Sequence, residues 1–280
     1  MAKILRKETM NPTVTLMEVE APLIAAKAQP GQFVIIRADA DGERIPLTIA
    51  DYDKQKKSVT IIFQIVGATT FRLNQLQEGD ALHDIVGPLG NPSDCSAKKV
   101  AIIGGGVGTA IAYPLAKKFF AQGTQVHAIT GFRTKDLVIL EDEFRSAAHE
   151  FELMTDDGSY GKKGLVTEAL KASLDKGEKY DEVIAIGPLI MMKFVAATTK
   201  PYGVKTTVSM NPIMVDGTGM CGGCRLSVGG KMKFACVDGP DFDGHEVDFG
   251  EALTRGGMYR PFEAKAYETA CNLFKKAVAQ

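Results

Sequence analysis

The sequence lacks the features that would mark a membrane, secreted or nucleic-acid-binding protein. No run of about 18 or more apolar residues is present, so no membrane-spanning helix is expected. The N-terminus, MAKILRKETMNPT, has charges where a secretory signal needs an apolar core. Neither sign of charge dominates, because 33 Lys and Arg residues stand against 34 Asp and Glu residues. We therefore expect neither nucleic acid nor a membrane as the partner.

Cysteine is scarce and unevenly placed. The five cysteines are odd in number and three of them are clustered, which does not suggest a disulfide framework. A reducing cytoplasm is the simplest setting for such a chain. Cys95 and Cys271 stand apart from the cluster, and we expect no chemical role for them. The chain also has no low-complexity tract and no internal repeat.

Residues 1–96 are rich in short β-forming runs that Gly and Pro separate. This rhythm predicts an antiparallel barrel or sandwich. The runs are TVTLMEVEA, QFVIIRA, IPLTIADYD and SVTIIFQIV, at residues 13–21, 32–38, 45–53 and 58–66.

From Lys99 onward, expected strands alternate with expected helices. Such alternation predicts a parallel-sheet α/β domain, which we place at residues 97–210. Residues 211–250 are Gly-rich, contain the clustered cysteines and form an expected small appendage. The last segment, 251–280, should close the chain with an amphipathic helix that Pro261 opens. The strands are expected at 98–106, 124–133, 150–158 and 180–188, and the helices at 109–123, at 164–177 and from 189.

A glycine-rich turn, IIGGGVGTA, joins the first parallel strand to its helix. Glycines let a backbone approach a phosphate closely, and the helix N-terminus offers free N–H groups. A tight packing turn is the alternative, because Thr109 stands where the usual G-x-G-x-x-G motif has its last Gly. The candidate nucleotide-binding residues of this turn are Gly104, Gly105, Gly106, Gly108 and Thr109.

Other candidates follow neighbouring strands. Gly187 and Pro188 come directly after a later parallel strand, and ligands of such sheets bind beyond the carboxyl ends of the strands. Arg133 follows the second strand, where it could contact a 2′-phosphate. Asp157 follows the third strand, where it could meet a ribose hydroxyl or cap a turn.

The segment DGTGMCGGCRLSVGGKMKFAC, residues 216–236, predicts a metal site. Plant-type [2Fe–2S] sites use C-x4-C-x2-C and a distant fourth cysteine. Asp216, Cys221, Cys224 and Cys236 reproduce this spacing with a carboxylate in the first position. A hard anionic ligand favours Fe(III) and so lowers the reduction potential, unless surrounding hydrogen bonds offset it. A zinc knuckle remains the alternative, with His245 as its fourth ligand.

The order of the motifs resembles that of the ferredoxin–NADP reductase superfamily. PGQF, IPLTIA, GPLG and IIGGGVGTA match its landmarks, and the resemblance implies an FAD-binding barrel followed by a nicotinamide-nucleotide domain. The segments DGTGMCGGCRLSVGG and KFACVDGP are similar to the electron-transfer subunits of dihydroorotate dehydrogenase. They are most similar to the small subunits of NADH-dependent ferredoxin–NADP oxidoreductases, also called sulfide dehydrogenase β subunits. The resemblance extends over nearly the whole chain.

The resemblance also implies flavin contacts by position. Arg44 stands one residue farther from Thr48 than the Arg-x-Tyr-Ser/Thr motif of the superfamily requires, and Gln64 replaces a basic residue. The implied flavin-binding residues are Pro46, Leu47, Thr48, Ile62, Phe63, Gln64, Thr69 and Thr70.

What the resemblance implies about function is electron transfer between NAD(H), FAD and a [2Fe–2S] cluster. It implies a heterodimer with a larger subunit that carries another flavin and [4Fe–4S] clusters. That complex would couple NADH, NADPH and ferredoxin by flavin-based electron bifurcation, with no acid–base catalytic residue in this chain. One alternative is the electron-transfer subunit of dihydroorotate dehydrogenase, whose pattern has Cys where Asp216 stands. The other is a scaffold that holds nucleotide and metal without turnover.

Overall fold

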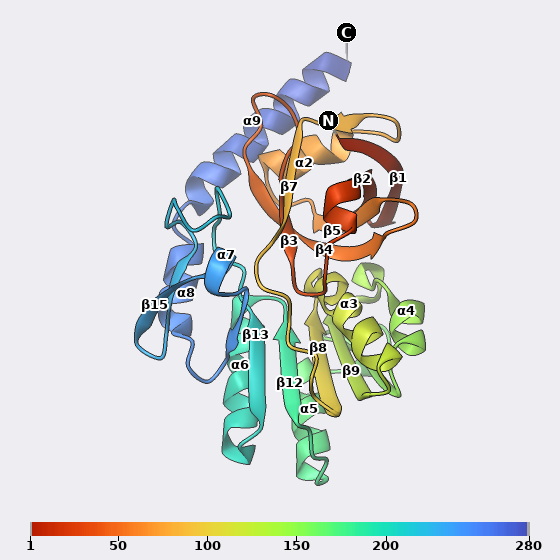
Figure 1. Cartoon of the computed structure of the whole chain (residues 1–280), viewed down its shortest axis with the longest axis vertical. Helices are drawn as coiled ribbons and strands as arrows, with labels where there is room; N and C mark the ends of the chain where they lie inside the picture. Colours follow the sequence, from red (N-terminus) through yellow and green to blue (C-terminus); the bar gives the residue numbers. More distant parts are fainter. Residues whose placement is uncertain (1, 279–280) are drawn as a thin grey trace.

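The computed structural model describes residues 2–278, with side chains described as far as Cys271. Two seven-stranded sheets and one two-stranded hairpin make up its strands. In Figure 1 the first sheet lies above the second, and the last helix runs back up beside the first. Among the described residues, no helix is both long and apolar enough to cross a membrane.

The first sheet is antiparallel and curls into a near-barrel, which confirms the expected fold of this half. Its order is β6-β1-β2-β5-β4-β3-β7, and the two outer strands, β6 and β7, are separated in sequence by His83 alone. The chain therefore joins the two edges of the sheet directly. The strands are β1 Ala2–Asn11, β2 Val14–Glu20, β3 Phe33–Arg37, β4 Ile45–Asp53, β5 Ser58–Gln64, β6 Ala81–Leu82 and β7 Asp84–Leu89, with helices α1 Pro22–Ala25 and α2 Ala68–Gln75.

The second sheet is parallel except at one edge, in agreement with the alternating pattern. Its order is β11-β10-β9-β8-β12-β13-β16, and the β13–β16 pair is antiparallel. The connections reverse direction between β8 and β12, so a crevice is expected beyond the ends of these two strands. The strands are β8 Lys99–Gly105, β9 Gln125–Phe132, β10 Glu150–Thr155, β11 Lys162–Lys163, β12 Glu182–Ile186, β13 Lys205–Ser209 and β16 Asp241–Asp243.

Helices cover both faces of the second sheet because successive strand residues point to opposite faces. On β8, Val100 and Ile102 pack with residues of α3 and α4. Ala101 and Ile103 pack on the other side with residues of α5 and α6. The helical segments here are α3 Gly108–Ala121, η1 Lys135–Leu137, α4 Glu141–Ser146, α5 Val166–Asp175, α6 Leu189–Thr199 and η2 Lys200–Tyr202.

The cysteine-bearing segment is less separate than the sequence suggested. Its strand β16 joins the edge of the second sheet, so the segment extends that sheet. The expected closing helix is confirmed as α9, which packs against α2 through a Phe71–Tyr267 ring pair 5.8 Å apart. A short helix, α8, precedes it and was not expected. This part contains β14 Arg225–Val228, β15 Lys231–Phe234, α7 Ala235–Asp238, α8 Phe249–Gly256 and α9 Arg260–Val278.

Candidate functional site

The two glycine-bearing loops meet where the sheet order reverses. A Cβ atom added to Gly108 would lie 2.5 Å from the carbonyl oxygen of Ile186 and 2.6 Å from Cα of Gly187. The loops after β8 and β12 can therefore touch only because both are glycine at the contact. Gly106 has a φ of +54° and open space beside its Cα, so the loop surface here is unobstructed. A phosphate could therefore approach the backbone of this turn closely.

Helix α3 begins at this edge, and its first turn presents backbone rather than side-chain groups. No side chain caps its first turn, whose N-cap residue is Val107. Thr109 is fully buried, and its hydroxyl has no hydrogen-bond partner within residues 2–271. That hydroxyl faces the backbone of Gly104, because a Cβ added there would lie 3.0 Å from it. A phosphate at this edge would meet the backbone of the turn and the positive end of the helix dipole, although the N–H groups of Thr109 and Ala110 already donate to the carbonyls of Gly106 and Val107.

Arg133 and Asp157 lie side by side after β9 and β10. The N–H of Asp157 donates to the carbonyl of Arg133 at 3.3 Å. Asp157 Oδ1 accepts hydrogen bonds from Ser159 N at 2.9 Å and from Ser159 Oγ at 2.7 Å, which hold the pKa of this carboxyl below its usual range. Asp157 is thus an ionised carboxylate that caps a turn. Its contact with a ribose stays a prediction, as does the phosphate contact of Arg133.

The residues expected to contact flavin gather at two places on the barrel. Pro46, Leu47 and Thr48 are half-buried on β4. The first turn of α2 lies near the start of that strand, because Thr69 Oγ1 donates to Glu43 at 2.9 Å. Thr70 caps the same helix, since its hydroxyl accepts the N–H of Gly67 at 3.1 Å and that of Val66 at 3.0 Å.

Strand β5 carries the other three flavin candidates. Phe63 is buried in the barrel core, and Ile62 is buried against the nucleotide domain. Their side chains are therefore structural, and a flavin contact at these residues would use the backbone. Gln64, at the end of the strand, is half-buried. Figure 1 shows strands β4 and β5 on the part of the barrel that faces the second sheet and α2 farther from it. The binding roles of all these candidates stay predictions.

Arg44 contacts the cysteine-bearing loop. Its Nε donates to the carbonyl of Val215 at 3.3 Å, and its Nη1 lies 3.4 Å from the Asp84 carboxylate. Next along this loop, Gly217 has a φ of +78°. A Cβ there would lie 2.9 Å from both Ile35 and Leu89, on β3 and β7. The loop that starts the predicted metal site is therefore seated on the barrel.

The clustered cysteines come together in part. Cys224 and Cys236 are buried with their sulfur atoms 3.2 Å apart. Burial, followed by the hydrogen bond with Cys224, raises the pKa of Cys236 to about 12, whereas the N–H of Gly219 acts to lower it. Cys221 is exposed on the same loop, and its Sγ accepts the N–H of Gly223 at 3.4 Å. As the side chains stand, no group of three potential ligands is closed within residues 2–271.

Asp216 lies next to Cys221 and is ionised. Its Oδ1 accepts the N–H of Thr218 at 2.6 Å, and its Oδ2 accepts the N–H of Cys221 at 3.0 Å. The bond from Thr218 is the main reason that the pKa of this carboxyl lies below its usual range. His245, the alternative ligand, is engaged elsewhere, because its Nε2 lies 3.0 Å from Thr199 Oγ1. Three thiols, an adjacent carboxylate and N–H groups aimed at sulfur fit an iron–sulfur cluster.

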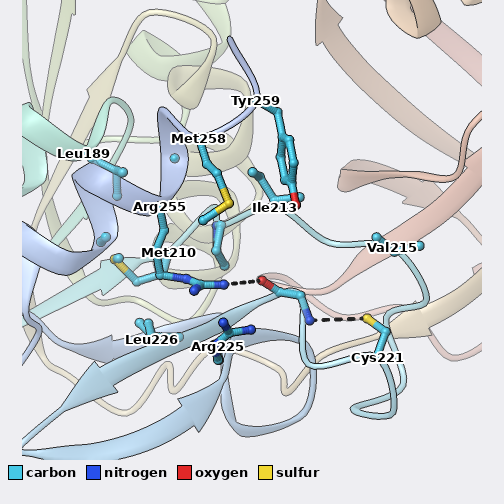
Figure 2. Close-up of a pocket in the computed structure, with 14 residues that line it drawn as sticks. Leu189, Met210, Ile213, Val215, Cys221, Arg225, Leu226, Arg255, Met258 and Tyr259 are labelled. Atoms are coloured by element: carbon cyan, nitrogen blue, oxygen red, sulfur yellow. Dashed lines mark hydrogen bonds between the residues drawn. The ribbon is translucent and has the colours of Figure 1, made fainter. Parts of the chain in front are cut away.

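Two arginines border this loop that the sequence did not single out. Arg225 Nη1 donates to the carbonyl of Gly222 at 3.2 Å, and Arg255 Nη2 donates to that of Gly223 at 3.2 Å. Both line a cavity of about 280 Å³ beside Cys221 (Figure 2). The position of Arg225, directly after Cys224, was a usable signal. Arg255 comes from α8, and nothing in the sequence places it near the cysteines.

Family comparisons match two parts of the chain. The iron–sulfur cluster binding domain of dihydroorotate dehydrogenase B matches residues 211–248. The oxidoreductase NAD-binding domain matches residues 102–197. The first match covers the loop with Asp216 and the three cysteines, and the second covers both glycine-bearing loops. These matches confirm that the chain contains an iron–sulfur-binding domain and an NAD-binding domain. The expected domain boundaries and the roles of individual residues stay predictions.

Similar proteins cover almost the whole chain. A dihydroorotate dehydrogenase B (NAD(+)) electron transfer subunit homolog from Thermotoga maritima is 46% identical over 267 residues, covering 95% of this chain and 94% of that protein. The electron transfer subunit from Bacillus caldolyticus is 35% identical over 235 residues, covering 80% of this chain and 89% of that protein.

Solved structures agree. One from a study of flavin-based electron bifurcation, the NADH-dependent reduced ferredoxin-NADP oxidoreductase, has a TM-score of 0.91. It shares 43% sequence identity and covers 96% of this chain and 97% of that chain. An Amycolatopsis cytochrome P450 reductase shares the fold alone, with a TM-score of 0.60 and 21% identity over 71% of this chain and 65% of that chain. The resemblance that the motifs indicated is confirmed, and the chain belongs to the family of dihydroorotate dehydrogenase B electron transfer subunits and their homologues.

Proposed function

We propose that this chain is the electron-transfer subunit of a complex that couples NADH, NADPH and ferredoxin by flavin-based electron bifurcation. In it, electrons would move between NAD(H), FAD and a [2Fe–2S] cluster. The observation that carries this proposal is the seat of Gly217 between Ile35 and Leu89. This contact holds the loop expected to bind the cluster against the barrel expected to bind FAD. The two glycine-bearing loops of the second sheet lie where its strand order reverses.

Each part of the chain has a distinct task in this proposal. The barrel, residues 1–96, would hold FAD, and residues 97–210 would hold NAD(H). Residues 211–250 would hold the cluster, and 251–280 would brace the barrel through α9. A flavin supplies the conversion between the two-electron hydride of nicotinamide and the single electrons that an iron–sulfur cluster carries.

The nucleotide would be bound mainly by the backbone. The turn from Gly104 to Thr109 would bind the diphosphate at the start of α3, and Gly187 and Pro188 would border it. The ionised carboxylate of Asp157 would accept ribose hydroxyl groups. The same negative charge disfavours a 2′-phosphate, which supports NAD(H) over NADP(H).

The cluster would be held by Asp216, Cys221, Cys224 and Cys236. Their loop is fixed at one end by Arg44, which donates to Val215, and by the contact of Gly217 with the barrel. These contacts hold the buried Gly217 against two apolar residues of the barrel, Ile35 and Leu89. The chain's own residues would therefore keep the two predicted redox sites close together, and no proton-transfer residue is required.

A larger catalytic subunit is the expected partner. The relatives are called electron transfer subunits, a name that supports a separate catalytic chain. We infer that the partner chain carries another flavin and [4Fe–4S] clusters and that ferredoxin exchanges electrons with the complex. The similarity to a reduced ferredoxin-NADP oxidoreductase supports the exchange with ferredoxin.

The second candidate is electron transfer to dihydroorotate dehydrogenase. The names of the relatives favour it. Against it stands Asp216, because the pattern of that subunit has Cys in this position. Reduction of the flavin by dihydroorotate in the isolated native complex would favour this second candidate. Reduction by NADPH through the larger subunit would favour the first.

Anaerobic mixing of the purified chain with NADH or NADPH tests the proposal. We expect NADH to bleach the flavin absorbance rapidly and NADPH to do so more slowly. A scaffold that binds nucleotide without turnover would show no bleaching with either. Faster reduction by NADPH would contradict the coenzyme preference and assign Arg133 to the 2′-phosphate.

A further inference from the structure

Both carbonyl groups between Cys221 and Cys224 accept a hydrogen bond from an arginine. Arg225 Nη1 lies 3.2 Å from Gly222 O, and Arg255 Nη2 lies 3.2 Å from Gly223 O. The two guanidinium groups come from different elements, the start of β14 and helix α8. In Figure 2 one dashed line joins Arg255 to the loop, and a second joins the loop to Cys221.

The contact of Arg225 fixes the direction of one backbone N–H group. A peptide unit is planar and trans, so its N–H points away from its C=O. In the Gly222–Gly223 unit the oxygen accepts from Arg225, and the N–H on the opposite side lies 3.4 Å from Cys221 Sγ. Holding the carbonyl toward the arginine therefore holds the N–H toward the sulfur.

Arg255 stands on a firmly attached helix. Asp248 Oδ1 caps α8 by accepting the N–H of Glu251 at 2.9 Å. The N–H of Asp248 donates to Ser227 O on β14 at 2.9 Å, which joins the helix to the cysteine-bearing hairpin. Arg255 is half-buried, and solvent screens a partly buried charge less than a charge on the open surface.

We propose that Arg225 and Arg255 are positioning residues that raise the reduction potential of the cluster. Arg225 aims the N–H of Gly223 at Cys221, and both arginines place positive charge beside the loop. Both effects stabilise the reduced cluster, which carries one more negative charge. They would offset the hard carboxylate of Asp216, which acts in the opposite direction. This inference rests on the proposed function, because it requires a cluster in the loop.

The test is an EPR-monitored redox titration of the purified full-length chain. We expect Arg255→Gln to reduce the equilibrium constant for one-electron reduction about tenfold, a shift of about −59 mV. Arg255→Lys, which keeps the charge, should stay close to the wild type. Arg145→Gln is the matched control, because it removes an exposed arginine that pairs with Glu141 on α4. It should leave the potential unchanged.

Each other outcome decides the inference. An unchanged potential in Arg255→Gln would overturn it. An equal shift in Arg255→Lys and Arg255→Gln would also overturn it, since packing alone would then be responsible. If Arg255→Gln loses its cluster, the reduction potential of Arg225→Gln is measured instead. A negative shift of that potential would support the inference, and an unchanged potential would overturn it. A wild-type chain without acid-labile sulfide would instead refute the proposed function.

Discussion

The N–H of Cys221 donates a 3.0 Å hydrogen bond to Oδ2 of Asp216, so a carboxylate and a thiol expected at the same metal site are adjacent. The other carboxylate oxygen accepts the N–H of Thr218. Asp216 therefore forms a turn that orders the loop, which is a common role for an Asp-Gly sequence. A ligand role and a turn role make different predictions for substitutions at this position.

If Asp216 binds iron, Asp216→Cys should keep the cluster and change its reduction potential, because thiolate is softer than carboxylate. Asp216→Ala should open the iron to water and make the cluster labile. EPR spectra of the reduced protein and the rate of iron loss to a chelator measure both effects. A turn role alone would leave the spectrum of the Ala variant nearly unchanged and give the Cys variant an alkylatable thiol.

Cys221→Ser should lose or cripple the cluster while FAD stays bound, because the expected flavin residues lie on the barrel. Iron, acid-labile sulfide and FAD analysis of the purified variant provide the measurement. Cys95→Ser is the matched control, since burial raises the pKa of that thiol to about 11 and keeps it unreactive. Zinc without sulfide in the wild type would contradict the cluster and favour the zinc knuckle.

The sequence predicted the fold well where short-range pattern determines structure. The β-rich runs and the strand–helix alternation were read correctly because burial repeats with a fixed period along each element. Strand β1 was missed because its many polar residues hide that period. Its buried residue Ile4 lies in a segment that is rich in charged residues. Spacing alone drew attention to Asp216. Arg255 could not be found this way, because the fold brings α8 to the cysteine loop.

Gly108→Ala should weaken NADH binding. The added Cβ would lie 2.5 Å from Ile186 O, so the two nucleotide loops must separate. Overpacking of this kind costs about 1–3 kcal/mol, which corresponds to roughly a tenfold rise in Kd for each 1.4 kcal/mol. Gly257→Ala is the control, because its Cβ would meet only ordinary contacts. Equal Kd values for NADH in both variants would argue against binding at this loop.

Gly217→Ala should slow electron exchange between flavin and cluster without slowing flavin reduction by NADH. Its φ of +78° disfavours a side chain by about 1–2 kcal/mol, and the Cβ would lie 2.9 Å from Ile35 and Leu89. Gly230→Ala is the control, because Gly230 also has a positive φ, +71°, but a Cβ added there would meet open space. Stopped-flow absorbance with freeze-quench EPR measures the rate of electron exchange in both variants. If both variants exchange electrons at the wild-type rate, the contact of the loop with the barrel has no role in electron transfer between flavin and cluster.

The most direct measurement of the central claim follows the cluster while nicotinamide is the only acceptor. The purified protein is fully reduced, separated from the reductant and mixed anaerobically with excess NAD(+). Electron transfer through one chain predicts that the EPR signal of the reduced [2Fe–2S] cluster disappears as the flavin is reoxidised and NADH forms. The account would be contradicted if the cluster signal persists while the flavin is reoxidised, or if it persists and no NADH forms.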